Sequence, residues 1–288
     1  MKLVKQGLLL ASMSVLGVAC GSQAMRASEE AQPQEWGTSV RAGQAEAEKL
    51  RNRSLDEEYK YGAEFDGAIK DPARAKETGV TIKTLENHPA SDYVNRIGQR
   101  LAAASDRPDL AFKFQLVEDD SINAFATMGG YVYMHAGLLK SAENEAQVAG
   151  VMAHEIAHIT HKHALQSMAN QAVYGGWVKG VGGLGGLVIG LGTAVLFQLP
   201  GSRAFEFEAD GTGFEAMRRA GYPAEQMVVF FKNVLGKGDP NDGKRHDWLS
   251  THPDTSRRVN ALNSRLTPGD SRGFGLNANE HARVINGL

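Results

Sequence analysis

The motif His154-Glu155-Ile156-Ala157-His158 constrains this chain more than any other part of its sequence. It lies within residues 142–168, where apolar side chains recur every three or four positions, a pattern that predicts one long helix. Residues four apart share one face of a helix, so both imidazoles can reach a single metal ion. The carboxylate of Glu155 would project beside them and could take a proton from a water molecule. The motif therefore predicts a zinc site that performs hydrolysis.

A zinc ion that hydrolyses its substrate needs a third protein ligand and an open position. His161 belongs to the same expected helix, but one further turn moves it away from a metal held by His154 and His158. The longer motif H-E-x-x-H-x-x-G-x-x-H also fails, because it requires glycine at the position of His161. We therefore expect His161 and His163 to be surface residues or residues that support a ligand.

A second helix, expected over residues 204–220, offers carboxylates for the third ligand position. Glu206 and Asp210 are four residues apart and share one face of this helix. One carboxylate could bind the metal, and the other could accept a hydrogen bond from a ligand histidine one turn later. Spacing alone does not choose Glu206 over Glu208, so both remain candidates for the third ligand.

The chain of 288 residues has a single cysteine, Cys20. One cysteine excludes an internal disulfide and a cysteine-rich zinc site, which leaves nitrogen and oxygen ligands for a metal. Lysine and arginine number 31, and aspartate and glutamate number 33, for a net charge of −2. This balance argues against a nucleic-acid partner bound through its phosphates.

The first 20 residues have the pattern of a secretory signal peptide. Lys2 and Lys5 precede a short apolar run over residues 7–19. This run is shorter than the roughly 20 residues that are needed to span a bilayer. The run ends at Cys20 in a sequence similar to a bacterial lipobox, so we expect acyl chains on Cys20 to anchor the protein to a membrane. An ordinary cleaved signal with an incidental cysteine is the alternative. Residues 21–40 are small and polar, and we expect them to form a flexible tether.

The remaining pattern predicts an α+β domain over residues 41–266, mainly helical and with a small sheet. Alternating apolar residues predict strands, and apolar residues at helical spacing predict helices. The Gly129-Gly130 pair is typical of a tight connection with unusual dihedral angles. We expect the C-terminal tail, residues 267–288, to be loose. The expected strands are 112–116, 122–127 and 131–134, and further helices are expected over 42–61, from an N-cap at Ser91 to Asp106, over 223–235 and over 253–266.

Glycine is frequent in residues 175–200, where it is mixed with valine, leucine, isoleucine and alanine. Gly182, Gly186 and Gly190 are four residues apart, a spacing that permits close helix packing. One interpretation is a buried helix pair under the active site, and another is an apolar lid or a hairpin that touches a membrane. A membrane-spanning helix over residues 181–199 is a weaker alternative, because glycine is so dense there.

Together these features resemble the zinc metalloprotease family of the HtpX and BepA type, which also includes the CAAX prenyl proteases. Three motifs carry the resemblance, H-E-I-A-H at 154–158, E-F-E-A-D at 206–210 and S-T-H-P at 250–253, and it extends over roughly residues 61–266. It implies a gluzincin-type α+β fold with the small sheet next to the H-E-x-x-H helix. One departure is Met128, where many members have proline. We recognise no tetratricopeptide repeats, which BepA-type proteins carry, in the sequence.

The resemblance also implies roles for single residues. Glu206 would be the third ligand of one zinc ion, and Asp210 would support the ligand set. His252 would be an additional ligand that can occupy the position of the water and keep the enzyme latent. Arg258 matches an arginine near the active site and could help to stabilise an oxyanion, with Arg257 as the adjacent alternative.

The function that the resemblance implies is a zinc-dependent endopeptidase of the bacterial cell envelope. Substrate, expected to be misfolded or stalled envelope proteins, would add as a β-strand along Asn123, Ala124 and Phe125. The expected location is the periplasm, with anchorage to the outer membrane through Cys20. The alternative function is a chaperone-like assembly factor in which His252 holds the zinc site closed.

Overall fold

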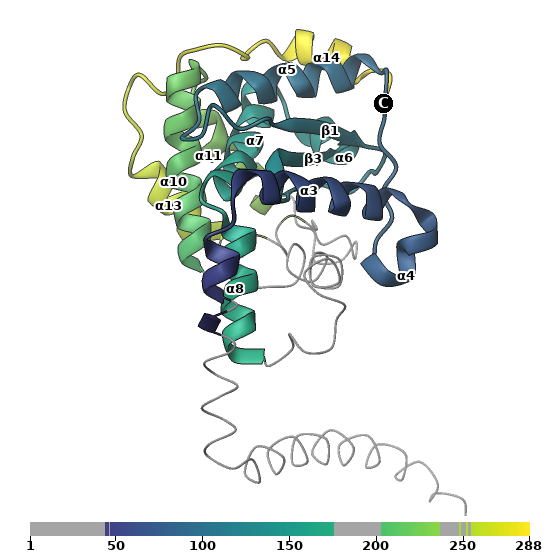
Figure 1. The fold of residues 1–288 in the computed structure, drawn as a ribbon. Helices are drawn as coiled ribbons and strands as arrows, with labels where there is room; N and C mark the ends of the chain where they lie inside the picture. The colour runs from purple at the N-terminus through teal and green to yellow at the C-terminus, as the bar shows by residue number, and fades with distance from the viewer. Residues whose placement is uncertain (1–43, 46, 176–202, 237–247, 249–251, 253–254) are drawn as a thin grey trace, which may run out of the picture.

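A small mixed β-sheet lies at the middle of the structure (Figure 1). Its strands are β1 (Lys113–Val117), β2 (Ala124–Ala126) and β3 (Tyr131–His135). The strand order is β1-β3-β2, with β1 parallel and β2 antiparallel to β3. Phe114 and Leu116 of β1 are buried and Lys113 is exposed, as the alternating pattern predicts. β3 is buried along its whole length, as expected for a strand that has a partner on each edge and helices above and below.

The computed structural model describes residues 44–45, 47–175, 203–236, 248, 252 and 255–288. Most of this part is helical, so the expected α+β class with a mainly helical body is confirmed. The main helices are α3 (Leu55–Lys70), α5 (Pro89–Ala103), α6 (Ala136–Ser141), α7 (Glu145–Thr160), α8 (His163–Gly175), α10 (Arg203–Ala220), α11 (Glu225–Gly236), α13 (Thr255–Asn263) and α14 (Ala278–Ile285). In Figure 1, α5 and α3 lie on opposite sides of the sheet. Helix α7 is central, because it packs against α10, α11, α5 and the sheet.

The connection between β2 and β3 confirms the expected role of two glycines. Gly129 and Gly130 have φ angles of 75° and 89°, which lie in the left-handed region that favours glycine. A Cβ atom on Gly129 would lie 2.5 Å from the carbonyl oxygen of Glu58 in α3. The turn therefore needs glycine both for its backbone angles and for its close approach to α3.

The prediction of a single helix over residues 142–168 is wrong, because the structure contains two helices there, α7 and α8. Asn144 caps the start of α7 by accepting a hydrogen bond from the backbone N–H of Gln147. Helix α7 ends at Thr160, and Lys162 has a left-handed φ of 55° before α8 begins. The Nζ atom of Lys162 lies 2.6 Å from Oε1 of Glu58 on α3. A contact between distant segments thus accompanies a break that the local apolar pattern does not indicate.

Other helix boundaries also differ from the expected ones. The helix expected over 42–61 is interrupted at Ser54, whose side chain forms a reciprocal capping box with Glu57 and starts α3. Helix α5 begins at Pro89 with His88 as its N-cap, because Nδ1 of His88 accepts a hydrogen bond from the backbone N–H of Ala90. Ser91, the expected N-cap, instead donates its hydroxyl to the carbonyl of Leu85.

We expected the C-terminal tail to be loose, but part of it is ordered in a helix. Residues Ala278–Ile285 form helix α14, which packs against α5. His281 is buried between them, with Nδ1 lying 2.9 Å from the hydroxyl of Tyr93 and Nε2 lying 3.1 Å from the carbonyl of Leu139.

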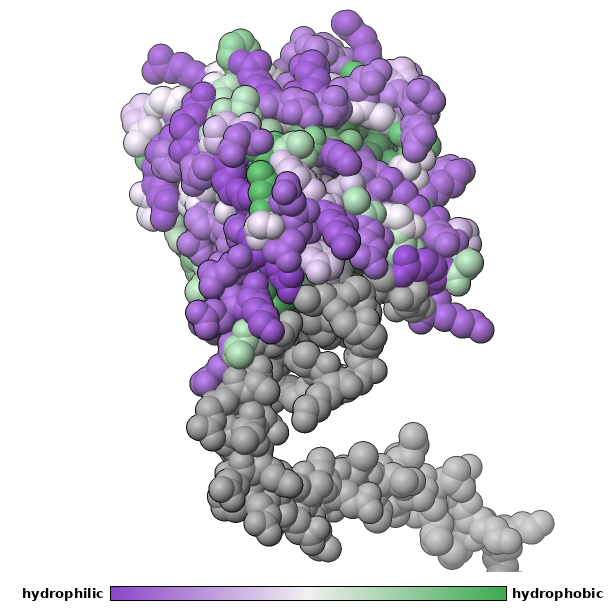
Figure 2. Space-filling view, in the orientation of Figure 1, coloured by the Kyte–Doolittle hydropathy of each residue, from purple (hydrophilic) through white to green (hydrophobic). Residues whose placement is uncertain are grey.

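Several sequence predictions fall outside the described residues. They are the signal peptide with Cys20, the tether over 21–40, and nearly all of the glycine-rich segment 175–200. Within the described part of the chain, no helix is both long enough and apolar enough to cross a bilayer. The face drawn in Figure 2 is mostly hydrophilic over that part.

Candidate metal centre and active site

Four side chains from three parts of the chain bring their donor atoms together. His154 and His158 come from α7, Glu206 comes from the first turn of α10, and His252 precedes α13. Each contributes one nitrogen or oxygen, and these atoms all lie within 4.8 Å of one another. Nε2 of His154 lies 3.0 Å from Nε2 of His158 and 3.5 Å from Oε2 of Glu206. Histidine nitrogen with one carboxylate oxygen is a donor set typical of zinc, so these residues fit the expected metal.

The crossing of α7 and α10 sets the distance between the histidines and Glu206. A Cβ atom on Gly213 of α10 would lie 2.9 Å from the backbone of Ala153 and His154, so the two helices touch there through their backbones. Glu206 lies about two turns before Gly213 and is buried at the metal cluster. Glu208 has a side chain that is 46% exposed, and it contacts His161 and His163. The geometry therefore places Glu206, and not Glu208, with His154 and His158.

A buried ion pair lies behind the donor atoms. Asp210 has Oδ1 2.9 Å from Nδ1 of His154, so it holds the ring nitrogen that faces away from the cluster. Arg258 donates through Nε and Nη2 to the two oxygens of Asp210, each at 2.8 Å. Nη1 of Arg258 lies 2.9 Å from Oε2 of Glu206 and donates to the carbonyl of His252. Arg258 is completely buried whereas Arg257 is exposed, so Arg258 is the arginine in the site.

The carboxylate of Glu155 lies next to the cluster on the same helix as both histidines. It is buried, and no described donor makes a well-formed hydrogen bond to Oε1, which lies 3.4 Å from Nε2 of His252. Burial raises the pKa of Glu155, although the charges of His252 and His154 oppose this effect. A carboxylate with a raised pKa and free acceptor capacity is suited to accept a proton from a water molecule.

The donor cluster stabilises positive charge at its centre. Burial alone would raise the pKa of Glu206, but the charge of His252 and hydrogen bonds from His154 and His252 hold that pKa far below its ordinary range. Burial alone would lower the pKa of His154, yet hydrogen bonds to Asp210 and Glu206 raise it to about 9. A site that favours a cation in this way is suited to a divalent metal ion.

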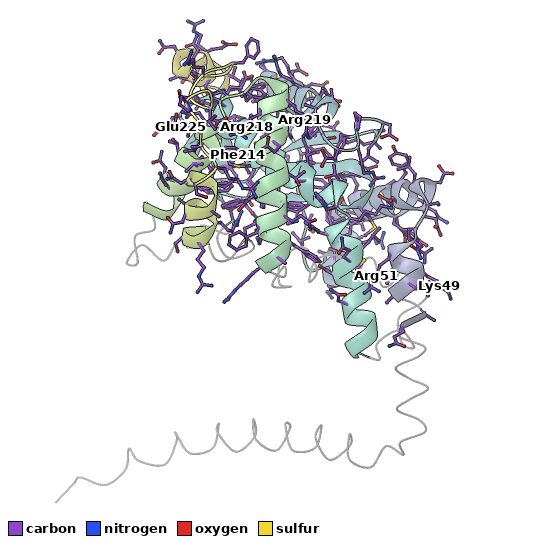
Figure 3. All side chains as sticks on the ribbon, turned by 90° about the vertical axis from the view of Figure 1, so that its left-hand side faces the viewer. Lys49, Arg51, Phe214, Arg218, Arg219 and Glu225 are labelled. Atoms are coloured by element: carbon purple, nitrogen blue, oxygen red, sulfur yellow. The ribbon has the colours of Figure 1, made fainter. Side chains whose placement is uncertain are left out.

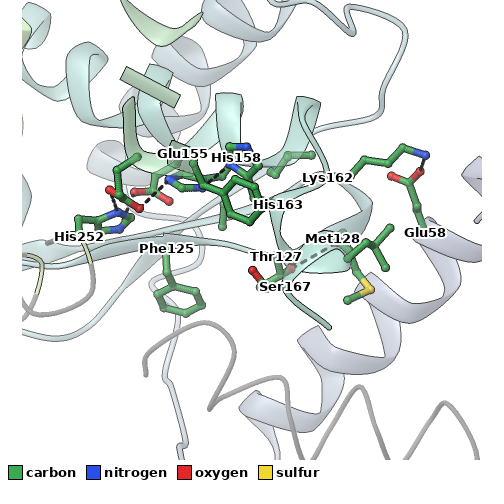
Figure 4. A pocket seen from close by; sticks show the side chains of 16 residues that line it. Glu58, Phe125, Thr127, Met128, Glu155, His158, Lys162, His163, Ser167 and His252 are labelled. Atoms are coloured by element: carbon green, nitrogen blue, oxygen red, sulfur yellow. Dashed lines mark hydrogen bonds and ion pairs between the residues drawn. The ribbon is translucent and has the colours of Figure 1, made fainter. Parts of the chain in front are cut away.

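A pocket leads from the cluster along β2 and α8. Figure 4 shows Glu155, His158 and His252 at one end of it and the Lys162–Glu58 pair at the other. Phe125 lines this pocket, and β2 is an edge strand of the described sheet. Asn123 is buried and uses its side-chain oxygen to accept from the backbone of Ala124. Of the three residues expected to bind substrate, Phe125 lines the pocket, whereas Ala124 is completely buried and Asn123 is not part of the pocket wall.

Two aromatic residues around the cluster, Trp248 and Phe231, were not assigned to the site from the sequence, and His163 was expected either at the surface or in support of a ligand. The indole of Trp248 stacks on the His252 ring at 4.9 Å, and Phe231 packs edge-on against His154 at 6.2 Å. Nδ1 of His163 lies 2.9 Å from Nδ1 of His158. The apolar pattern of residues 223–235 indicates that Phe231 is buried but not what it contacts, and neither Trp248 nor His163 lies at a ligand spacing.

A helix that carries H-E-x-x-H, a carboxylate from a second helix and a buried glutamate beside them define the site of a metallopeptidase. The comparison with known protein families agrees, because residues 89–266 match the model of peptidase family M48. The match includes more than half of the chain. The protein belongs to peptidase family M48.

Individual relatives support the same class. The β-barrel assembly-enhancing protease of Escherichia coli (strain K12) is 33% identical over 195 residues, which is 62% of this chain and 40% of that protein. The mitochondrial metalloendopeptidase OMA1 of Schizosaccharomyces pombe is 28% identical over 186 residues, which is 62% of this chain and 54% of that protein. The match thus spans about two fifths of the length of the bacterial relative and about half that of the yeast relative.

Proposed function

We propose that this protein is a zinc-dependent endopeptidase that hydrolyses protein chains in the bacterial cell envelope. The observation that carries the proposal is the convergence of donor atoms from His154, His158 and Glu206, with the buried carboxylate of Glu155 beside them. Membership of peptidase family M48 supports the reaction class. The proposed metal is zinc, because the donors are imidazole nitrogens and one carboxylate oxygen.

In the proposed mechanism the protein residues orient the reactants and move one proton. When bound, zinc supplies a Lewis acid that polarises the substrate carbonyl and lowers the pKa of water. Glu155 accepts the proton of the attacking water and later returns it to the leaving amine. All three donor nitrogens of Arg258 face Asp210, Glu206 and the carbonyl of His252, so we propose that it positions the ligands and does not donate to an oxyanion.

The proposed substrates are misfolded or stalled envelope proteins. Phe125 lines the pocket and β2 is an edge strand of the described sheet, so an extended segment could add there as a further strand. The name of the E. coli relative, β-barrel assembly-enhancing protease, supports an envelope substrate. The proposed location is the periplasm, with acyl chains on Cys20 as the anchor to the outer membrane. The mass of the mature N-terminal peptide checks whether Cys20 carries these acyl chains.

A second candidate function is a chaperone-like assembly factor whose zinc site is held closed. The position of His252 favours it, since Nδ1 of this residue lies 3.1 Å from Nε2 of His154 and 3.0 Å from Oε2 of Glu206. A histidine in this position would compete with water for the metal, and the protein could then act through binding alone.

Replacing Glu155 by glutamine tests the proposed function. We expect hydrolysis of an unfolded protein such as casein to fall by about 10²- to 10⁴-fold, because the variant has no group to accept the proton. Zinc content should stay at one ion per chain, because His154, His158 and Glu206 are unchanged. Glu64→Gln, a matched change on α3, should keep the activity of the wild type.

Each measurement is repeated in a His252→Ala background, so that a latent enzyme is not scored as an inactive one. Full hydrolysis by Glu155→Gln would contradict the general-base role. If the wild-type protein binds no zinc at neutral pH, the proposal that it is a zinc-dependent endopeptidase is contradicted. If cells that carry Glu155→Gln behave as wild type, the assembly-factor function is the main one.

A further inference from the structure

A second group of polar side chains lies beside the metal donors but not among them. It consists of His161, His163 and Glu208, whose nearest donor atoms lie within 4.8 Å of one another. Nδ1 of His163 lies 2.9 Å from Nδ1 of His158, and Nε2 of His163 lies 3.1 Å from Oε2 of Glu208. His163 is buried, and Figure 4 shows it next to His158. The group therefore touches the proposed ligand His158 through the ring of His163.

The break between α7 and α8 makes this contact possible. On one continuous helix, His163 would lie about 140° around the axis from His158, because it follows five residues later. The left-handed backbone of Lys162 ends α7 and lets α8 begin at His163. The ring of His163 then stacks on Phe205 at 4.3 Å and 11°. A left-handed conformation is unfavourable for a residue with a side chain, so the chain leaves its preferred path at the point where the contact forms.

The contacts indicate which nitrogen carries the single hydrogen in each of the two neutral histidine rings. Nε2 of His158 faces Glu206 and His154, and a nitrogen that binds a metal carries no hydrogen. The single hydrogen of neutral His158 is then on Nδ1, which donates to Nδ1 of His163. The hydrogen of His163 is consequently on Nε2, which donates to the carboxylate of Glu208. Every donor in this chain of three side chains meets an acceptor.

We propose that His163 and Glu208 are positioning residues for the metal centre, forming a carboxylate–imidazole chain that accepts the Nδ1 hydrogen of His158. The inference rests on the metal centre of the proposed function. The chain would keep the Nε2 lone pair of His158 turned towards the metal and would raise its basicity. Asp210 does the same directly for His154, from 2.9 Å. Each ligand histidine of α7 thus has its own partner.

A second metal ion bound by His161, His163 and Glu208 is the rival explanation of the same group. A metal on Nε2 of His163 would leave the hydrogen of that ring on Nδ1. It would then face the Nδ1 hydrogen of His158 across a distance of only 2.9 Å. The two metals would therefore disfavour each other, and one zinc ion per chain is the expected stoichiometry.

Zinc affinity, measured by competition with a chromophoric chelator on the full chain, tests the positioning chain. His163→Phe keeps a ring that can stack on Phe205 but removes the acceptor, so we expect zinc binding to weaken by about 10- to 100-fold. His163→Gln offers an amide oxygen and should recover part of this loss. His161→Phe is the matched control, because Nδ1 of His161 lies 3.2 Å from Oε1 of Glu208 and Nε2 lies 2.9 Å from the hydroxyl of Thr212, so both ring nitrogens face partners other than His158. It should stay within about threefold of wild type.

Further readouts separate positioning from folding. Glu208→Leu changes a half-exposed side chain outside the core and should weaken zinc binding several-fold even if His163→Phe folds poorly. In zinc-loaded, ¹⁵N-labelled wild type, the Nδ1–H of His158 should be visible by NMR, and in His163→Phe it should exchange faster with solvent. Urea unfolding of each variant shows whether its fold is intact.

Unchanged zinc affinity in folded His163→Phe and Glu208→Leu would overturn the positioning chain alone. Two zinc ions per wild-type chain and one in His161→Phe would overturn it in favour of a second metal site. Wild type that binds no zinc would overturn the proposed function, and the positioning chain with it.

Discussion

At the scale of single residues, the candidate metal centre includes charges that are buried in pairs. Arg258 is completely buried and forms a two-point hydrogen bond with Asp210. Burial alone would lower the pKa of Arg258 and raise that of Asp210, but each partner shifts the other towards its charged form. Removing one member of such a pair leaves an uncompensated charge in the interior, which is more costly than removing both.

Arg258→Met should accordingly lower the free energy of unfolding by about 3–5 kcal/mol. The double variant Asp210→Asn with Arg258→Met should lose about 1–3 kcal/mol less than the sum of the two single variants. Urea unfolding with a chelator present measures these values independently of metal binding. Strict additivity of the two changes would show that the pair is not coupled.

At the scale of elements, the site depends on the close crossing of α7 and α10. Gly213→Ala would place a Cβ atom 2.9 Å from the backbone of Ala153, which cannot move without α7. We expect a loss of stability of about 1–3 kcal/mol and weaker zinc binding, because Glu206 moves away from the histidines. Differential scanning calorimetry and chelator competition measure the two effects.

Gly67 on α3 supplies the control for this change. No atom lies within 4 Å of a Cβ atom built there, and the residue is exposed. Gly67→Ala should therefore stabilise the protein by about 0.5–1 kcal/mol through helix propensity. If both alanine variants stabilise the protein, the close crossing of the two helices is not a constraint.

At the scale of the whole molecule, an ion pair between Arg218 and Asp270 connects the segment after α13 to helix α10. Arg218 lies near the C-terminal end of α10 (Figure 3) and donates twice to Asp270, at 2.7 Å each time. These hydrogen bonds from Arg218 lower the pKa of Asp270 to about 2. The stabilisation is fully present above the unfolded value of 3.8 and is lost as the pH falls through about 2.

Asp270→Asn should reduce the free energy of unfolding by about 1 kcal/mol at pH 6, after allowance for solvent screening. The difference from wild type should shrink between pH 4 and pH 2, because the wild-type carboxylate becomes protonated there. Asp120→Asn, at a surface pair with Lys140, should show less than about 0.5 kcal/mol at any pH. Urea unfolding across this range measures both variants, and a difference for Asp270→Asn that persists at pH 2 would contradict the ion-pair explanation.

Local patterns predicted only the part of the site that is close together in sequence, and Glu206, Asp210, His252 and Arg258 were implied by the resemblance to the HtpX and BepA type. His154 and His158 were identified because residues four apart share one helix face, and Glu155 because it follows the first histidine of the H-E-x-x-H motif. The connection at Gly129 was identified because left-handed backbone favours glycine. The boundary at Ser54 could also have been found, because Ser54 and Glu57 have the spacing of a capping box.

The rest could not be predicted because it depends on contacts between distant segments. The apolar pattern of α7 continues past Lys162, whereas the structure breaks there next to the pair with Glu58. The composition of residues 267–288, rich in glycine and asparagine, predicted a loose tail and did not indicate that His281 is buried against Tyr93.

The sequence by itself predicted the reaction class and two candidate ligands, because the spacing of residues on a helix is a property of the local chain. Only the tertiary structure placed Glu206, and not Glu208, among the donors, Arg258 behind them, and His163 against His158. These choices depend on how two helices approach and rotate against each other, and that is set by packing such as the contact at Gly213.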